Sequence, residues 1–195
     1  MSFLRPFSFA DALPPLAGQG VDLRAPELRD YEEWAALRER SRAFLTPWEP
    51  TWPENDLTRT AFLARMRRYA RDVRADAAYP YFIYRRSDGV LIGGLTLGQV
   101  RRGVAQATSL GYWMGEPYAG KGHMTDAVRA LAPFVFQTLR LRRIEAACLP
   151  NNVASVRLLE RVGFVREGYA RSYLCIAGEW RDHLLYALLS TDPLR

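Results

Sequence analysis

The chain has 195 residues, of which 49% are apolar and 25% are charged, and its 27 basic and 21 acidic residues leave a net charge of +6. These proportions are typical of a soluble chain the size of one ordinary domain. No run of about 18 apolar residues occurs, which excludes a membrane-spanning helix. The arginines are scattered, so we expect a solvated basic surface that attracts an anionic cofactor or an RNA-bound partner, without direct nucleic-acid binding.

The N-terminal segment, residues 1–20, is expected to be an irregular arm on a single domain that covers residues 1–195. Pro14 and Pro15 interrupt its short apolar patch, and it lacks the apolar core and the small-residue cleavage site of a signal peptide. We therefore expect a cytoplasmic protein.

The cysteines and histidines do not indicate a metal site. Cys148 and Cys175 each lie inside an apolar run, which predicts two buried free thiols. His123 and His183 are isolated, and the spacing typical of metal ligands is absent. We expect no structural metal.

The first part of the chain predicts a strand followed by two helices. The strand is the segment VDLRAP, which Pro26 closes. Apolar residues recur at helical spacing over residues 27–44 and again over residues 56–74, where Asp56 is a candidate N-cap. Residues 44–55, between the two helices, are rich in proline and tryptophan and cannot form a regular helix.

An antiparallel meander of three strands is predicted next. Asp88-Gly89 between two apolar runs is a strong hairpin signal, and a second turn near Gly103 leads to the strand ATSLGYWMG. A glycine-rich loop then opens a helix over residues 122–138, in which Pro133 is expected to cause a kink or an early end. The remaining elements are a strand at 142–149, a helix at 152–162, and strands at 164–176 and 182–190. This order predicts a single α/β (α+β) fold with a mixed sheet.

The loop before that helix predicts an anion site. In Gly120-Lys121-Gly122 the glycines let backbone N–H groups approach an anion closely, and the helix N-terminus adds unpaired donors and positive dipole. Lys121 is the only lysine in the chain, and a compact ammonium suits a phosphate. The spacing differs from the common nucleotide-binding loops. The segment therefore predicts a phosphate or pyrophosphate site, the alternative being a tight turn that needs glycine for its geometry alone.

The same loop resembles the acetyl-CoA loop of the GNAT acetyltransferases, whose pattern is Gln/Arg-x-x-Gly-x-Gly/Ala between a strand and a helix. Gly122 matches the central glycine, whereas Ala119 and Met124 depart from the pattern. The resemblance implies a sheet of six to seven mostly antiparallel strands, flanked by roughly four helices, with splayed strands that form an acetyl-CoA cleft. It implies acetyl-CoA as the cosubstrate, no metal, and cofactor contacts from Tyr112, Trp113, Met114, Gly120, Lys121, Gly122, His123, Met124, Thr125 and Asn152.

The segment LPNNVASVRLLERVGF resembles the strand–helix–strand that follows this loop in the same family. Asn152 matches the asparagine that contacts the pantetheine arm, and it can also cap the helix. Ser155 is implied to donate a proton or a hydrogen bond to the departing sulfur, the alternative being a hydroxyl bonded back to the helix backbone. Some relatives carry an acid–base pair where this chain has Ala147 and Leu159, so that pair is missing.

Three further motifs, FLTPWEP, RIEA and GEWRDHLLYALL, resemble the ribosomal-protein alanine N-acetyltransferases within that family. The resemblance implies acetyl transfer to the N-terminal α-amine of a protein. Glu145 and Glu49 are candidate general bases; the alternative for Glu145 is a structural or surface carboxylate, and the alternative for Glu49 is a place in the lining of the acceptor cleft. Trp48 and Trp52 are candidate walls of the acceptor site, where Glu49 would attract the incoming ammonium, or else they fill the core.

Two other functions remain open from the sequence. One is acetylation of a small amine such as a polyamine, an aminoglycoside or an amino acid, and the other is a non-catalytic CoA-binding or RNA-associated protein. An acidic cleft would favour the polycationic small amines, whereas an open groove with backbone-pairing edges would favour a peptide.

Overall fold

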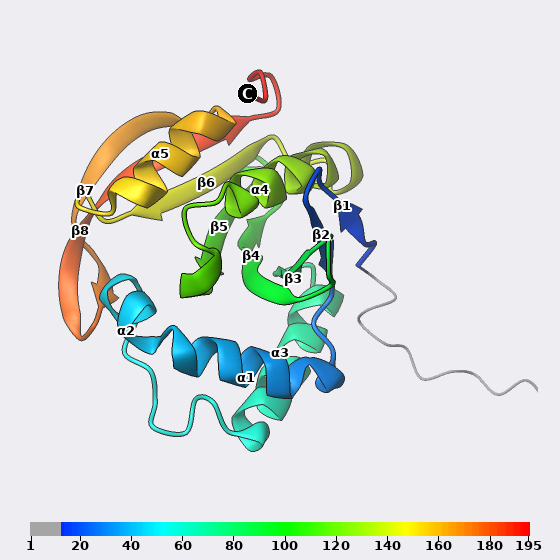
Figure 1. Cartoon of the computed structure of the whole chain (residues 1–195). Coiled ribbons are helices and arrows are strands. Elements are labelled where there is room, and N and C mark those ends of the chain that lie inside the picture. The colour runs from blue at the N-terminus through cyan, green and yellow to red at the C-terminus, as the bar shows by residue number, and fades with distance from the viewer. Residues whose placement is uncertain (1–12) are drawn as a thin grey trace, which may run out of the picture.

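The computed structural model describes residues 13–195, which form one eight-stranded sheet with helices on both of its faces (Figure 1). The strands lie in the order β1-β2-β3-β4-β5-β6-β8-β7, and every neighbouring pair is antiparallel except β5 and β6. Their bounds are β1 Leu16–Ala17, β2 Val21–Arg24, β3 Tyr79–Arg85, β4 Leu91–Arg101, β5 Ala107–Met114, β6 Arg143–Cys148, β7 Val165–Ile176 and β8 Glu179–Leu189. The α-helices are α1 Tyr31–Arg40, α2 Arg42–Leu45, α3 Arg59–Arg74, α4 His123–Pro133 and α5 Val153–Val162.

The predicted mixed, mostly antiparallel sheet is confirmed, with one more strand and one more helix than expected. The extra strand is Leu16–Ala17, which pairs with β2 inside the segment predicted to be irregular. The rest of that predicted arm, residues 1–12, lies outside the described residues. The extra helix arises because the backbone at Ser41 leaves the helical region (φ −99°, ψ 7°) and separates α1 from α2.

Two local predictions near α3 and α4 had different outcomes. Thr58, not Asp56, caps α3, since its side chain accepts a hydrogen bond from the backbone N–H of Ala61 at 3.2 Å. Asp56 instead pairs with Arg65 at 2.8 Å. The prediction for Pro133 is confirmed, because α4 ends at this residue and a π-helical turn continues the chain.

Alternate residues of β3 face two separate cores, which places helices on both sides of the sheet. Tyr81 and Ile83 belong to the core that includes the buried face of α4. Phe82 and Tyr84 point the other way and pack with α1 and α3. Within the described residues, no helix has both the length and the apolar character needed to cross a membrane.

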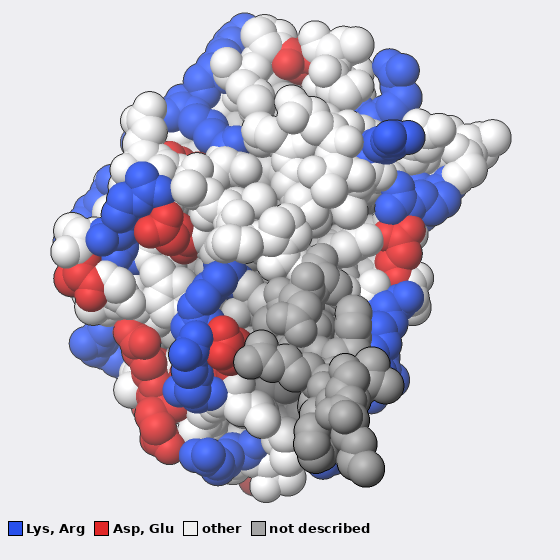
Figure 2. Space-filling model, turned by 90° about the vertical axis from the view of Figure 1, so that its right-hand side faces the viewer, with Lys and Arg blue, Asp and Glu red and all other residues white. Residues whose placement is uncertain are grey.

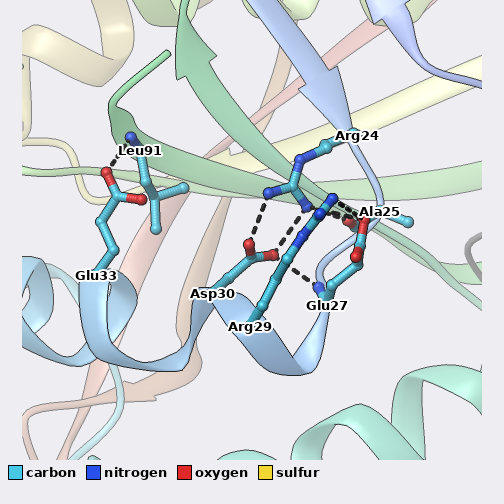
Figure 3. A network of polar contacts seen from close by, with 7 residues as sticks. All are labelled: Arg24, Ala25, Glu27, Arg29, Asp30, Glu33 and Leu91. Carbon is cyan, nitrogen blue, oxygen red and sulfur yellow. Dashed lines mark hydrogen bonds and ion pairs between the residues drawn. The ribbon is translucent and has the colours of Figure 1, made fainter.

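Polar contacts tie the start of α1 to the sheet (Figure 3). Arg24 at the end of β2 donates to both carboxylate oxygens of Asp30, at 2.9 and 2.6 Å. The backbone N–H of Glu27 also donates to Asp30, at 2.7 Å, and Glu33 accepts from the backbone N–H of Leu91 on β4 at 2.6 Å. These contacts fix the orientation of α1, and the chain continues from α1 through α2 into the segment TPWEP at residues 46–50.

The distribution of charge on the surface agrees with the prediction, whereas the burial of the two cysteines agrees with it only for one of them. On the face shown in Figure 2, basic and acidic side chains lie interspersed, as a solvated surface predicts. Cys148 is buried, as expected, but Cys175 is exposed, so the prediction of two buried thiols is wrong for the second. Cys175 lies on β7, which is the edge strand of the sheet and has only β8 beside it.

The sheet splits between β5 and β6. The two strands pair only over Ala107–Ser109 and Arg143–Glu145. Beyond those residues β5 continues to Met114 beside β4, and β6 continues to Cys148 beside β8. The strands are therefore splayed, as expected, and the gap between them forms the floor of the candidate site.

Candidate active site

Two cavities open on the gap between β5 and β6. The larger, of about 460 Å³, is lined by the loop before α4 and is called the loop cavity here. The smaller, of about 320 Å³, is lined by the β7–β8 hairpin and is called the hairpin cavity. Four residues line both cavities and therefore mark their junction: Trp48, Tyr112, Asn152 and Ser155.

The loop cavity has the chemistry of a phosphate site. Gly120 and Gly122 adopt left-handed φ values of 71° and 84°, which favour glycine, and Gly122 is the residue from which α4 starts. The helix N-terminus thus presents its unpaired N–H groups to the cavity. Three cations line the same cavity, namely Lys121, which the sequence indicated, and Arg157 and Arg161 of α5, which sequence reasoning missed.

Every residue predicted to hold acetyl-CoA lines the loop cavity. Met124, which departs from the family pattern, packs in the core on α4 and is only 6% exposed, so its bulk is directed largely away from the cavity. Gly115 N donates to Ile92 O on β4 at 2.8 Å. By the alternation of an antiparallel ladder, Trp113 also faces β4 with its N–H, while Tyr112 and Met114 direct theirs into the gap. These features fit an extended, anionic thioester cosubstrate.

Tyr112 and Ser155 meet at the junction of the cavities. Ser155 lies in the first turn of α5, where Asn152 accepts a hydrogen bond from its backbone N–H at 3.1 Å and so caps the helix. The Ser155 hydroxyl is hydrogen-bonded to the Tyr112 phenol, which gives it a side-chain partner instead of a helix carbonyl. Burial raises the pKa of the Tyr112 phenol far above its usual range, although the hydrogen bond to Ser155 lowers it, so the phenol stays neutral.

The phenol of Tyr112 was missed by sequence reasoning, which considered only its backbone. The nearest signal was an aromatic residue on the strand that enters the glycine loop. That signal could not reveal a partner 43 positions along the chain.

The hairpin cavity lies between the TPWEP segment and the β7–β8 hairpin. Ala177 N donates to Glu49 O at 2.9 Å and fastens the hairpin to this segment, which Figure 1 shows beside α2. Among the described residues, those lining the cavity include no Asp, Glu, Lys or Arg. Burial raises the pKa of the Cys148 thiol. The lining is Trp48, Pro50, Leu110, Gly111, Tyr112, Ala147, Cys148, Leu149, Asn152, Ser155, Leu174, Cys175, Ile176 and His183.

Glu49 lines the loop cavity, and its charge is already balanced. Arg38 of α1 donates to its two carboxylate oxygens at 2.8 and 2.7 Å, and Trp52 Nε1 donates at 2.7 Å. The Arg38 guanidinium also lies over the rings of Trp52 and Trp113, at 4.0 and 5.0 Å from their centroids. Glu49 and Trp52 do not line the hairpin cavity, whereas Trp48 does. Arg38, which holds this cluster together, was not found from the sequence.

Glu145, the other candidate base, lies away from both cavities. It is placed where β6 pairs with β5, and it forms ion pairs with Arg101 and, at 2.8 Å, with Arg143. This is the placement of a structural carboxylate, the alternative that the sequence left open.

The splayed sheet, the glycine loop and the helix N-terminus define an acyltransferase of the acetyl-CoA-binding class. The chain belongs to the family described as "Acetyltransferase (GNAT) domain", which matches residues 21–165. It is 36% identical to the probable N-acetyltransferase YjcK of Bacillus subtilis, over 91% of this chain and 98% of that protein. It is 35% identical to the ribosomal protein uS5 alanine N-acetyltransferase of Escherichia coli, over 85% of this chain and 86% of that protein.

Solved structures agree with this assignment. The structure of Mycobacterium smegmatis RimJ in complex with CoA-disulfide matches with a TM-score of 0.85 and 32% identity, covering 91% of this chain and 87% of that one. The ribosomal-protein-S5-alanine acetyltransferase of Vibrio fischeri also matches with a TM-score of 0.85, at 28% identity, covering 91% of this chain and 97% of that one. The protein is therefore an acetyl-CoA-dependent N-acetyltransferase. Across residues 13–195, no cluster of three or more His, Cys, Asp or Glu side chains could hold a metal ion.

Proposed function

We propose that this enzyme acetylates the N-terminal α-amine of a protein, with alanine or serine as the first residue. The observation that carries the proposal is the hairpin cavity, which lies directly against the Tyr112–Ser155 pair and has no carboxylate among its described lining residues. A site for a polyamine or an aminoglycoside would need acidic groups to bind the several positive charges of those substrates. An uncharged cavity instead favours an amine that enters neutral.

The free energy of deprotonation also favours an N-terminal α-amine over a lysine side chain as the acceptor. The reference pKa is about 7.7–8.0 for an α-amine and about 10.4 for a lysine side chain. Near neutrality the α-amine is therefore easier to deprotonate by roughly 3.4 kcal/mol. A cavity of about 320 Å³ with Trp48, Leu174 and Ile176 in its walls accommodates a small first residue. The names of the relatives, which include ribosomal-protein alanine acetyltransferases, support a ribosomal protein as the partner.

The residues at the junction have separate tasks in this reaction. Acetyl-CoA supplies the activated acetyl group, and the loop cavity holds its pyrophosphate on the backbone of residues 120–125. The N–H groups that β5 directs into the gap polarise the acetyl carbonyl. Either hydroxyl can donate in the Tyr112–Ser155 hydrogen bond; with the neutral phenol as the donor, the serine hydroxyl is free to donate a hydrogen bond to the departing sulfur. The described site thus supplies cofactor binding, carbonyl polarisation and support of the leaving group.

CoA release in the presence of acetyl-CoA tests the proposal. Peptides with a free N-terminal alanine should turn over, while the same peptides blocked at the N-terminus but carrying internal lysines should not. Faster reaction of the lysine peptides or of spermidine would replace the protein N-terminus with a small or side-chain amine as the acceptor. Absence of transfer to any amine would leave a CoA-binding protein without this activity.

A further inference from the structure

The proposed site still lacks a group that receives the proton of the acceptor amine. The Glu49 carboxylate already accepts hydrogen bonds from Arg38 and Trp52, and Glu145 lies outside both cavities. Imidazole is the side chain that ordinarily changes charge near neutral pH. The hairpin cavity contains one among its described lining residues, His183 of β8.

The hydrogen bonds of His183 determine which ring nitrogen is basic. The side chain is buried, at 3% exposure, and Nδ1 lies 2.9 Å from the backbone carbonyl oxygen of Arg181. Since a carbonyl oxygen can only accept, Nδ1 carries the hydrogen and donates, and the lone pair of the neutral ring is on Nε2. Nε2 has no hydrogen-bond partner within residues 13–195, and the ring packs edge-on against Tyr173 with centroids 5.7 Å apart.

We infer that His183 Nε2 is the general base of the reaction, a role that rests on the proposed function. As the acceptor nitrogen forms its bond to the thioester carbonyl carbon, Nε2 takes the proton that this nitrogen sheds. The carbon–sulfur bond breaks, and its electron pair goes to sulfur, which Ser155 stabilises by a hydrogen bond. His183 then returns its proton to solvent, and the thiolate takes one from solvent, so that protons and electrons balance.

The surroundings of His183 leave its ring free for this task. On β8, Asp182 interacts electrostatically with His183, but its carboxylate accepts from Tyr169 and, at 2.7 Å, from the backbone N–H of Ser172. Arg181 faces His183 with its carbonyl, while its guanidinium pairs with Glu179 at 2.6 Å. The other titratable groups around the ring and the cavity are Tyr173 and Cys175 of β7, Cys148 of β6 and Tyr112 of β5. No carboxylate in the described cavity competes for the proton.

The pH dependence of His183→Asn separates a base from a structural residue. The asparagine amide can still donate toward the Arg181 carbonyl but lacks Nε2. We expect kcat with an N-terminal alanine peptide to fall by about 10²-fold or more at pH 7, the usual contribution of a general base. The deficit should shrink as the pH rises past about 8, because hydroxide in the solvent can then remove the proton that Nε2 would otherwise take. The acetyl-CoA affinity and Tm should stay close to those of the wild type.

Two further variants complete the test. His183→Ala should regain activity on addition of imidazole, whatever its loss of Tm, because the small base can enter the cavity. His123→Gln, the matched variant at the other histidine, should weaken acetyl-CoA binding without changing the pH profile of kcat. A deficit of His183→Asn that is the same at every pH, or no deficit at all, would overturn the inference. The same series is run on whichever amine the wild type acetylates, so a wrong acceptor assignment is recognised separately.

Discussion

Removing the Ser155 hydroxyl is expected to slow acetyl transfer without weakening acetyl-CoA binding. Ser155→Ala deletes the group that lies at the junction of the two cavities and that is hydrogen-bonded to the Tyr112 phenol. The hydroxyl interacts with little charge in the ground state and with a developing thiolate in the transition state. Its loss should therefore appear in kcat and not in KM.

The magnitude follows from the kind of hydrogen bond that is lost. A hydrogen bond to a charged group contributes about 1.5–3 kcal/mol, which corresponds to a decrease in kcat of about 10- to 150-fold. Truncation also leaves the buried phenol without its partner, so the free energy of unfolding should fall by about 1–3 kcal/mol. Tyr112→Phe should give a smaller loss of kcat than Ser155→Ala. In the double variant, the increase in the activation free energy should be smaller than the sum of the increases in the two single variants, because the two groups act together.

Steady-state kinetics on purified variants, with thermal unfolding in parallel, provide the measurement. Ser109→Ala is a suitable control, because this half-buried serine of β5 lines neither cavity and its hydroxyl donates to Gln99. Its kcat should match that of the wild type. An unchanged kcat in Ser155→Ala would refute the reasoning and leave the sulfur to water or backbone groups. A rise in KM for acetyl-CoA at constant kcat would make Ser155 a binding residue only.

Other variants test the loop cavity, the arginine–glutamate pair and the buried phenols. Gly122→Val forces a β-branched residue into a φ of 84° and should abolish acetyl-CoA binding measured by calorimetry. Lys121→Ala, at an exposed position, should weaken acetyl-CoA binding only modestly. An unchanged acetyl-CoA affinity in Gly122→Val would disprove the loop assignment. Arg38→Ala leaves the carboxylate of Glu49 largely buried and without its cationic partner. It should lower the free energy of unfolding, measured in denaturant titrations, by about 3–5 kcal/mol. A loss below about 1 kcal/mol would show that the ion pair is solvated. Burial raises the pKa of Tyr79 to about 12, and it also raises the pKa of four other phenols. When the pKa of a phenol is higher in the folded state, the phenol contributes stability below its unfolded-state pKa of about 10, and this stability is lost as the pH rises above that value. Tm should therefore stay level up to about pH 9.5 and fall beyond about pH 10. A Tm unchanged at about pH 11.5 would contradict this reasoning. The four other phenols are those of Tyr81, Tyr84, Tyr112 and Tyr186.

Features encoded within a few neighbouring residues could be predicted from the sequence. The Asp88-Gly89 hairpin, the end of α4 at Pro133 and the Asn152 cap each depend on backbone geometry that one or two residue types prefer. The glycine loop before α4 belongs to the same class, because left-handed φ values and a helix N-terminus are local properties. For that reason the predicted cofactor residues all line one cavity.

The reacting centre depends on strand order and on the splay of the sheet, which no local pattern encodes. Tyr112 meets Ser155 only because β5 separates from β6 and leaves the phenol facing α5. His183 lines the hairpin cavity because β8 inserts between β6 and β7.

The same long-range geometry decided which charged side chains are free to act. Glu145 and Glu49 look alike as carboxylates in the sequence, and each is neutralised by arginines that the fold brings to it, Arg101 and Arg143 for the first and Arg38 for the second. The sequence by itself determined the class of cofactor and the position of the glycine loop, since backbone donors and glycine conformations are local. Only the tertiary structure decided which side chains surround the acceptor, because desolvation and ion pairing depend on neighbours that are distant along the chain.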